Sequence, residues 1–334
     1  MLPAIGVPDI VGLAQRFVAS RSEHRDVAIS VLNGAIGDRL HEAGSPLAVE
    51  AKLLVGEGHS DAIPHPAPSE ACLFVHGLMG SEHDWSMWSE GEKVVDYPKV
   101  LSAERDALPI FARYNTGLHI STNGRALSQH LEMLVERWPQ LETLSVVAHS
   151  MGGLVVRSAC HYGLEAGHTW VAKLQRVMLL GVPSHGATME QLAHVASFTL
   201  EAIWNPWTKL VGKAINMRSA GIKDLRHGFV LDEDWRNLDV DQLRLAAPRV
   251  PTTAPHVKWY IAVASLGAPG STMGKLVGDG AVLPRSAQGQ GFGTDAAGVL
   301  AGAEVCVFHE TSHARLLRDP AVLEQILQWW PAEP

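Results

Sequence analysis

The stretch Leu144-Ser-Val-Val-Ala-His149-Ser150-Met-Gly152-Gly153 decides how this chain folds. A run of β-branched and apolar residues, typical of a buried strand, ends in a turn of small residues, and helix-forming residues follow. Ser150 lies at the turn, which predicts a nucleophile elbow, a strained strand-to-helix turn that presents a serine. Ala148 occupies the first position of the usual G-x-S-x-G pattern, where a residue nearly as small as glycine is tolerated. Because such a short match also occurs by chance in Gly-rich loops, the partners of Ser150 must come from the rest of the chain.

The composition is that of a globular protein, with 334 residues of which 46% are hydrophobic and 19% are charged. This length suits one large α/β domain with room for an insertion, or at most two domains. The formal net charge is −8 and no Lys/Arg cluster occurs, so we expect no nucleic-acid partner. The three cysteines lie in apolar segments and are expected to be reduced and buried: Cys72, Cys160 and Cys306.

No apolar run in the sequence approaches the roughly 18 residues of a membrane-spanning helix. The first residues lack the basic and continuous apolar regions of a signal peptide. We therefore expect a cytoplasmic protein without a transmembrane segment. The oligomeric state stays open.

Residues 1–66 predict an N-terminal helical extension. Apolar side chains recur there at helical intervals, with expected breaks at Asn33-Gly34 and at 44–46: Ile29, Leu32, Ile36 and Leu40. The Pro-rich segment 61–69 separates this extension from the main domain, residues 67–334. The sequence assigns the extension no chemistry.

The main domain alternates predicted strands with predicted helices, which favours βαβ units around a mostly parallel sheet. Strands are expected at 71–75, 109–114, 144–148, 174–180, 256–264 and 304–308. Helices are expected at 121–138, at 151–166 and from about 313 to 330. Residues 187–255 interrupt the alternation and predict a helical cap over the carboxyl edge of the sheet. Its aromatic residues, Trp204 among them, either receive an acyl chain or pack the cap onto the domain.

Two glycine-rich loops follow predicted strands. His76-Gly-Leu-Met-Gly80 would free backbone N–H groups where an oxyanion needs them, or would form an ordinary βα turn. Gly181-Val-Pro-Ser-His185-Gly186 places a histidine just beyond a strand end, either in a pocket or as a loop-structuring residue.

A serine nucleophile requires a neutral imidazole that takes its proton and a carboxylate that orients this imidazole. After an elbow of this kind, the acid follows a later strand and the histidine follows the last strand. Asp279, between two glycines, meets the first requirement, and Asp295 in the same loop is its rival. His313 at a loop-to-helix junction is preferred to His309, which directly ends the last strand.

The stretch His309-Glu-Thr-Ser-His313 also reads as H-E-x-x-H, which binds zinc when it lies on a helix. The residues before it predict a strand, so the motif straddles an element boundary. Leu316 and Asp319 occupy the positions where an extended zinc motif has glycine and histidine. We therefore expect neither a bound metal nor a cofactor.

These motifs together resemble α/β-hydrolases of the bacterial esterase/lipase group, and are similar to lipase-like proteins related to GPI inositol-deacylases. The resemblance covers about residues 70–330 and rests on five stretches: His76–Gly80, Ala148–Gly153, Leu180–Gly186, Gly278–Val282 and Ser312–Pro320. It implies the α/β-hydrolase fold, a mostly parallel central sheet flanked by helices, with a helical cap insertion.

The resemblance also implies roles for individual residues. Ser150 would be the nucleophile, Asp279 the acid and His313 the base. The oxyanion would be held by the backbone N–H groups of two residues, Leu78 and Met151. Four further side chains are candidate pocket residues: His76, His149, His185 and Trp204.

The expected activity is hydrolysis of carboxylic esters through an acyl-enzyme, with a small-molecule or lipid ester as substrate. Amidases, thioesterases and acyltransferases share this triad, so the sequence does not separate them. A non-catalytic binding protein on the same scaffold is the alternative from another class, and labelling of Ser150 by a fluorophosphonate distinguishes it.

Overall fold

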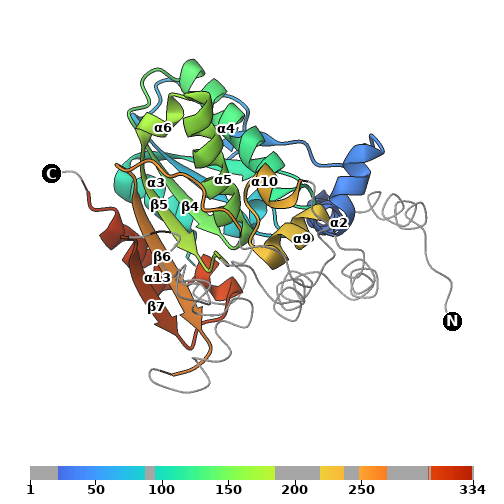
Figure 1. Cartoon of the computed structure of the whole chain (residues 1–334). Coiled ribbons are helices and arrows are strands. Elements are labelled where there is room, and N and C mark those ends of the chain that lie inside the picture. Colours follow the sequence, from blue (N-terminus) through green and yellow to red (C-terminus); the bar gives the residue numbers. More distant parts are fainter. Residues whose placement is uncertain are drawn as a thin grey trace.

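The computed structural model describes residues 22–86, 95–184, 219–236, 248–268, 300 and 302–332. A seven-stranded sheet in the order β1-β3-β2-β4-β5-β6-β7 lies at the centre of this part of the chain (Figure 1). β1 is antiparallel to β3, and the other neighbouring strands are parallel. This confirms the mostly parallel sheet of the α/β-hydrolase fold.

The strands β2 to β7 match the predicted ranges closely, whereas β1 was not predicted. Their bounds are β1 Lys52–Val55, β2 Glu70–Val75, β3 Ala107–Arg113, β4 Thr143–His149, β5 Leu174–Leu180, β6 Lys258–Ser265 and β7 Glu304–His309. The helices are α2 Ser22–Glu42, α3 Tyr97–Arg105, α4 Ile120–Arg137, α5 Met151–Ala166, α6 Trp170–Lys173, α9 Ala220–His227, α10 Asp232–Trp235 and α13 Pro320–Trp329. Short 3₁₀ helices are η1 Glu82–Trp85 and η3 Ala314–Leu317.

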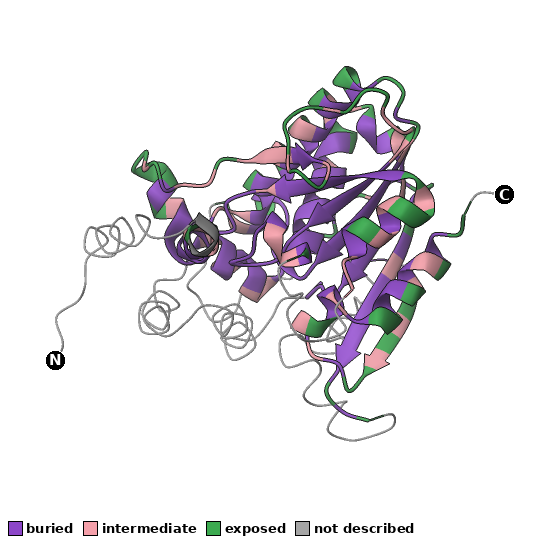
Figure 2. Cartoon of the chain, turned by 180° about the vertical axis from the view of Figure 1, so that it is seen from behind, coloured by how far each residue is buried: buried purple, intermediate pink, exposed green. Residues whose placement is uncertain are grey.

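Two apolar cores lie on opposite faces of the sheet, because successive strand residues point to opposite sides. In β2, Leu73 and Val75 belong to the core that α2, α4, α5 and α9 cover. Cys72 and Phe74 belong to the core that α3 and α13 cover. Figure 2 shows the central strands buried along most of their length. Because these strands are buried on both faces, their sequences are continuous runs of apolar residues.

The C-terminal segment departs from the single helix expected from about 313 to 330. η3 ends at Leu317, and α13 begins at Pro320. Asp319 caps α13 through a hydrogen bond from the Ala321 N–H to its Oδ1, at 2.9 Å. Proline lacks the N–H that would continue the preceding turn, so the prediction of one helix was wrong.

The N-terminal segment contains both helix and strand. α2 passes through the expected break at Asn33-Gly34 and kinks at Ile36, where φ is −142°. Lys52–Val55 form β1, which pairs with β3, so the purely helical interpretation of residues 1–66 was wrong at this point. A four-residue strand is too short to produce a pattern that can be recognised. The domain boundary near residue 66 stays a prediction.

The cysteines are unpaired, and Cys72 and Cys160 are buried as predicted. Cys306 is half-buried, because β7 is the edge strand of the sheet and its side chains are less covered. Among the described helices, none has both the length and the apolar character that crossing a membrane requires.

Candidate active site

Ser150 lies at the junction between the central strand β4 and helix α5. Its φ is 52° and its ψ is −125°, a conformation that a residue with a Cβ rarely adopts. The Ser150 N–H donates to the Leu180 carbonyl on β5 at 2.9 Å. The backbone therefore has the strained strand-to-helix turn that the sequence predicts, and it is held at the carboxyl edge of the sheet.

Small residues let neighbouring backbone segments approach this turn. A Cβ on Gly152 would lie 2.5 Å from the carbonyl oxygens of both Val75 and His76. A Cβ on Gly77 would lie 3.0 Å from the Ser150 Cβ. The loop 76–80 thus packs directly against the elbow, as expected of an oxyanion loop.

The loop is fixed by hydrogen bonds on both sides. The Tyr114 hydroxyl donates to the His76 carbonyl at 2.5 Å. Met79 has a positive φ of 61°, and its N–H donates to Thr116 Oγ1 at 3.2 Å. Leu78 lies between Gly77 and Met79 and is buried. Its position suits the predicted oxyanion role, which stays a prediction.

Met151 supplies the first N–H of α5. Helix N-terminal N–H groups carry a partial positive charge and stabilise a nearby anion. The Met151 side chain is covered by α9, since a Cβ on Gly221 would lie 3.1 Å from the Met151 Cε. This placement suits the second predicted oxyanion donor.

His313 lies in the turn after β7, directly before η3, and its side chain is buried. A Cβ on Gly181, which follows β5 with a φ of 61°, would lie 2.9 Å from the His313 Nδ1. Gly181 directly follows Leu180, whose carbonyl oxygen accepts the hydrogen bond from the Ser150 N–H. His309, by contrast, is exposed, and its Nδ1 lies 3.1 Å from the Gly267 carbonyl.

The motif His309–His313 does not lie on one helix. β7 ends at His309, and η3 begins at Ala314. The two imidazoles therefore do not have the spacing that the H-E-x-x-H zinc motif needs.

His149 contacts both the oxyanion loop and the segment that carries His313. Its Nε2 lies 3.2 Å from the His313 carbonyl oxygen, and the two rings are 4.6 Å apart. Its Nδ1 would lie 3.2 Å from a Cβ on Gly77. Burial, and then the proximity of His313, hold the pKa of His149 well below its usual range. His149 is thus a neutral side chain that links two parts of the site.

His76 packs beneath the loop that it begins. Its ring stacks on Tyr114 at 4.4 Å, and burial lowers its pKa to about 4. The imidazole is therefore uncharged at neutral pH. Its role as a pocket residue stays a prediction.

Asp84 in η1 is a titratable group that the sequence motifs did not indicate. A Cβ on Gly80 would lie 2.1 Å from the Asp84 Oδ2, so this carboxyl lies against the oxyanion loop. Burial raises the pKa of Asp84 to about 7. The polar run Ser81–Asp84, directly after the loop, was the signal available in the sequence.

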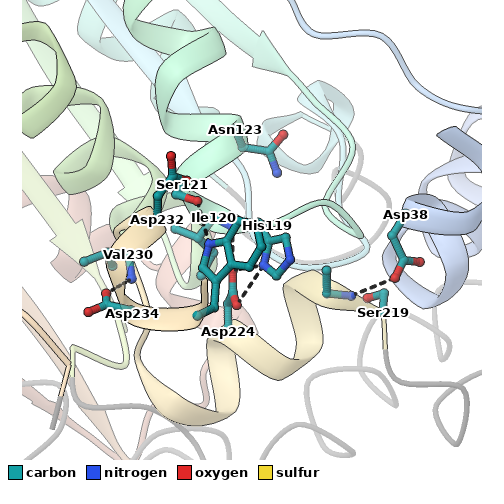
Figure 3. A network of polar contacts seen from close by, with 12 residues as sticks. Asp38, His119, Ile120, Ser121, Asn123, Ser219, Asp224, Val230, Asp232 and Asp234 are labelled. Carbon is teal, nitrogen blue, oxygen red and sulfur yellow. Dashed lines mark hydrogen bonds and ion pairs between the residues drawn. The ribbon is translucent and has the colours of Figure 1, made fainter. Parts of the chain in front are cut away.

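Part of the predicted cap segment, residues 219–236, docks on the main domain (Figure 3). Asp224 on α9 accepts a hydrogen bond from the Ile120 N–H at 2.8 Å and lies 3.0 Å from the His119 Nδ1. The Ser219 hydroxyl donates to the Gly34 carbonyl of α2 at 2.7 Å. α9 is therefore anchored to both α4 and α2.

α10 is anchored to α4 in a similar way. The Trp235 ring stacks on His119 at 3.6 Å, and its Nε1 donates to Ser121 Oγ at 3.0 Å. Arg125 on α4 pairs with Asp232 at 2.9 Å. These contacts hold α10 against α4, and the Asp232 N–H also donates to the Tyr162 hydroxyl on α5 at 2.8 Å.

Several predicted residues lie outside the described part of the chain. They are the acid Asp279, its rival Asp295, and the candidate pocket residues His185 and Trp204. The predicted cap at 187–255 is described only for 219–236 and 248–255. These predictions stay untested.

Solved structures of similar fold include the Bacillus licheniformis lipase BlEst2 in its propeptide form. The two chains are 17% identical with a TM-score of 0.52, over 84% of this chain and 54% of that chain. The mature form is 19% identical with a TM-score of 0.47, over 83% of this chain and 97% of that chain. The carboxylesterase CesB (YbfK) from Bacillus subtilis is 12% identical with a TM-score of 0.44, over 90% and 98%. At 17% identity, the similarity to the propeptide form of BlEst2 indicates a shared fold and nothing further.

No curated protein matches this sequence. Residues 68–261 match the PGAP1-like alpha/beta domain, which is more than half of the 334-residue chain. The matched range begins before β2 and ends within β6, so it contains the loop 76–80 and the turn at Ser150. The chain therefore belongs to the PGAP1-like alpha/beta domain family.

Proposed function

We propose that this protein is a serine hydrolase that cleaves carboxylic esters, with Ser150 as nucleophile, His313 as base and Asp279 as acid. The observation that carries the proposal is the strained backbone of Ser150, at a φ of 52° between β4 and α5. Strain of this kind is retained where a serine must be presented to a substrate. The burial of His313 beside Gly181 supports the choice of base.

In the proposed reaction, the Ser150 Oγ attacks the ester carbonyl carbon while His313 accepts the hydroxyl proton. The N–H groups of Leu78 and Met151 donate to the oxyanion of the tetrahedral intermediate. The C–O bond to the alcohol then breaks, and His313 gives its proton to the leaving oxygen. Water, deprotonated by His313, then attacks the acyl carbon. The bond from this carbon to the Ser150 Oγ breaks, His313 returns the proton to Oγ, and the carboxylic acid is released. Asp279 would orient the imidazole.

The nucleophile is tested with a fluorophosphonate probe, which forms a covalent bond to an activated serine. We expect labelling of the wild type and of Ser86→Ala, a matched change at an exposed serine. Ser150→Ala should abolish both labelling and turnover of p-nitrophenyl esters while the circular dichroism spectrum is retained. Labelling that persists in Ser150→Ala contradicts the assignment, and no labelling of the wild type favours a non-catalytic binding protein.

The acid is tested by comparing Asp279→Asn with Asp295→Asn. An Asn at the acid position leaves the imidazole in the wrong tautomer, and about 10⁴-fold is lost from kcat in a well-studied triad. We expect a loss of this order in Asp279→Asn and near wild-type kcat in Asp295→Asn. The reverse result would move the acid to Asp295.

The substrate is proposed to be a small-molecule or lipid-like ester, because the segment 187–207 is rich in apolar residues. A series of p-nitrophenyl esters of increasing chain length tests this, and a preference for acetyl over octanoyl would contradict a lipid-like acyl group. Parallel assays with matched amides, thioesters and alcohol acceptors separate the esterase from amidase, thioesterase and acyltransferase. A cytoplasmic location is part of the proposal and is tested by cell fractionation.

A further inference from the structure

Two histidines and a glutamate gather beside the oxyanion loop without any role in the proposed triad. His59 lies in the turn after β1, and Glu82 and His83 begin η1. One ligand atom from each lies within 4.8 Å of the others. The His59 and His83 rings are 5.2 Å apart.

A fourth ligand group comes from helix α2. The Asp26 Oδ2 lies 3.6 Å from the His83 Nε2. The Glu82 Oε1 lies 3.5 Å from the same nitrogen. The His83 Nε2 therefore lies within 3.6 Å of two carboxylates, one on α2 and one on η1.

Two of these separations match the distance between ligands of one tetrahedral ion. Zinc binds nitrogen and oxygen ligands at about 2.0–2.2 Å, which places neighbouring ligands roughly 3.3–3.6 Å apart. The distances from the His83 Nε2 to the Glu82 and Asp26 carboxylates, 3.5 and 3.6 Å, are of this size. The other pairs need side-chain movement to come into range: the ligand atoms of His59, Glu82 and His83 lie within 4.8 Å of one another. Such movement is open to His83, which is 31% exposed, and to Asp26, which is 50% exposed.

We propose that His59, Glu82 and His83, with Asp26 as the fourth ligand, form a binding site for a divalent transition-metal ion of the zinc class. Imidazole nitrogens select such ions over Mg²⁺ and Ca²⁺, which prefer oxygen ligands alone. Glu82 is 1% exposed, so the site has one fixed, buried carboxylate around which the other three ligands can close.

Arg113 sets the charge balance of the site. Its Nε donates to the Glu82 Oε2 at 3.0 Å, which leaves Oε1 as the oxygen that faces His83. The Arg113 Nη2 also contacts Oε1, and this nitrogen has to move when an ion binds. Arg113 is 32% exposed, so its guanidinium has room to turn while the Nε contact holds Glu82 in place. With neutral imidazoles, two carboxylates face a single guanidinium, and a divalent cation compensates the excess negative charge.

A cavity beside the site gives an ion access from solvent. Asp26, Glu82 and Arg113 line a cavity of about 470 Å³ that lies between α2 and the loop 76–81. An ion held by Asp26 and Glu82 would connect α2 to the segment directly after the oxyanion loop. The N-terminal segment, to which the sequence assigned no chemistry, would then stabilise the active-site loop. This inference does not depend on the proposed reaction.

The test uses the full chain after removal of metals with a chelator. Isothermal titration with Zn²⁺ should show one ion per chain, and the melting temperature should rise by several degrees at saturating Zn²⁺. His59→Ala and His83→Ala should each weaken Zn²⁺ affinity at least tenfold. His41→Ala, at an exposed histidine on α2, is the matched control and should bind as the wild type does. Mg²⁺ should cause no shift.

The alternative is that His83 is an imidazolium that bridges Asp26 and Glu82 without an ion. His59→Ala separates the two, because it leaves both carboxylate contacts of His83 in place. Equal Zn²⁺ binding by His59→Ala, His83→Ala and the wild type would overturn the proposal, as would the absence of Zn²⁺ binding. Substituting Co²⁺ should add a visible absorption spectrum of tetrahedral type, and a spectrum of hydrated Co²⁺ alone would contradict the site.

Discussion

The His149 Nε2 lies 3.2 Å from the carbonyl oxygen of His313, a residue 164 positions later in the chain. Since a carbonyl only accepts, the proton of the His149 ring must be on Nε2 for this hydrogen bond to form. The same ring packs against Gly77 of the oxyanion loop. One neutral side chain therefore fixes the distance between the predicted base and the predicted oxyanion donors.

The first prediction concerns this link. His149→Ala should lower kcat for p-nitrophenyl esters by up to about 100-fold, because small displacements of catalytic groups are costly, while KM changes little. His149→Gln, whose side-chain amide still donates, should recover a large part of the loss. A kcat equal to that of the wild type in His149→Ala would show that His313 is positioned by other contacts.

The second prediction separates the two candidate bases. His313→Ala should reduce kcat by at least about 10²-fold, because the serine then lacks a proton acceptor. His309→Ala should keep near wild-type activity, since the His309 side chain is exposed and bonds to Gly267. The measurement is steady-state ester hydrolysis, with thermal melts to confirm folding. A larger loss in His309→Ala would reverse the assignment.

The third prediction tests the close packing under the elbow. Gly152→Ala would place a Cβ 2.5 Å from two backbone carbonyl oxygens, which cannot be relieved by rotating a side chain. We expect a loss of about 1–3 kcal/mol in the free energy of unfolding. Gly58→Ala is the control, because nothing lies within 4 Å of the added Cβ, and it should stay within about 0.5 kcal/mol of the wild type. Urea denaturation measures both, and equal stabilities would contradict the packing.

The strands and the elbow could be predicted because their signals are local. β4 and β5 are buried on both faces and give unbroken apolar runs, and Ser150 follows one of them directly. β1 was missed because it has four residues and gains its stability from pairing with β3. The prediction of one helix from 313 to 330 was wrong for a different reason, because it passed over a local start signal, the Asp319 cap followed by Pro320.

The site could be predicted only in part. Chain order after an elbow indicates Ser150 and His313, since it follows from the topology of the sheet. The contact of His149 with His313 and the gathering of His59 with His83 depend on tertiary approach, for which the sequence carries no local pattern. Asp279 lies outside the described residues, so its assignment rests on the sequence motif alone.

The fourth prediction concerns the anchor of the cap segment. Asp224→Ala would leave the Ile120 N–H and the His119 ring without their buried partner (Figure 3). We expect a loss of about 1–3 kcal/mol in the free energy of unfolding and faster proteolysis in residues 219–236. Asp61→Ala, at an exposed aspartate, is the control. Protection of 219–236 from protease as in the wild type would show that the apolar contacts of α9 suffice.

The fifth prediction is a pH dependence of stability that originates at Asp84. Burial raises the pKa of its carboxyl from 3.8 to about 7 in the folded protein. As the pH rises between these values, the unfolded chain releases a proton that the folded chain still holds. The contribution of Asp84 to stability therefore falls across this window and stays unfavourable above it.

Asp84→Asn removes this titration while it keeps the size of the side chain. The melting temperature of the variant relative to the wild type should therefore be higher at about pH 8 than at about pH 4. Asp61→Asn, on the exposed surface, is the control for a general effect of lost negative charge. A relative melting temperature of Asp84→Asn that is constant with pH, or that falls as the pH rises, would contradict a raised pKa of this carboxyl in the folded protein. Such a result would mean that Asp84 is ionised in the folded protein at neutral pH, with a charged carboxylate beside Gly80.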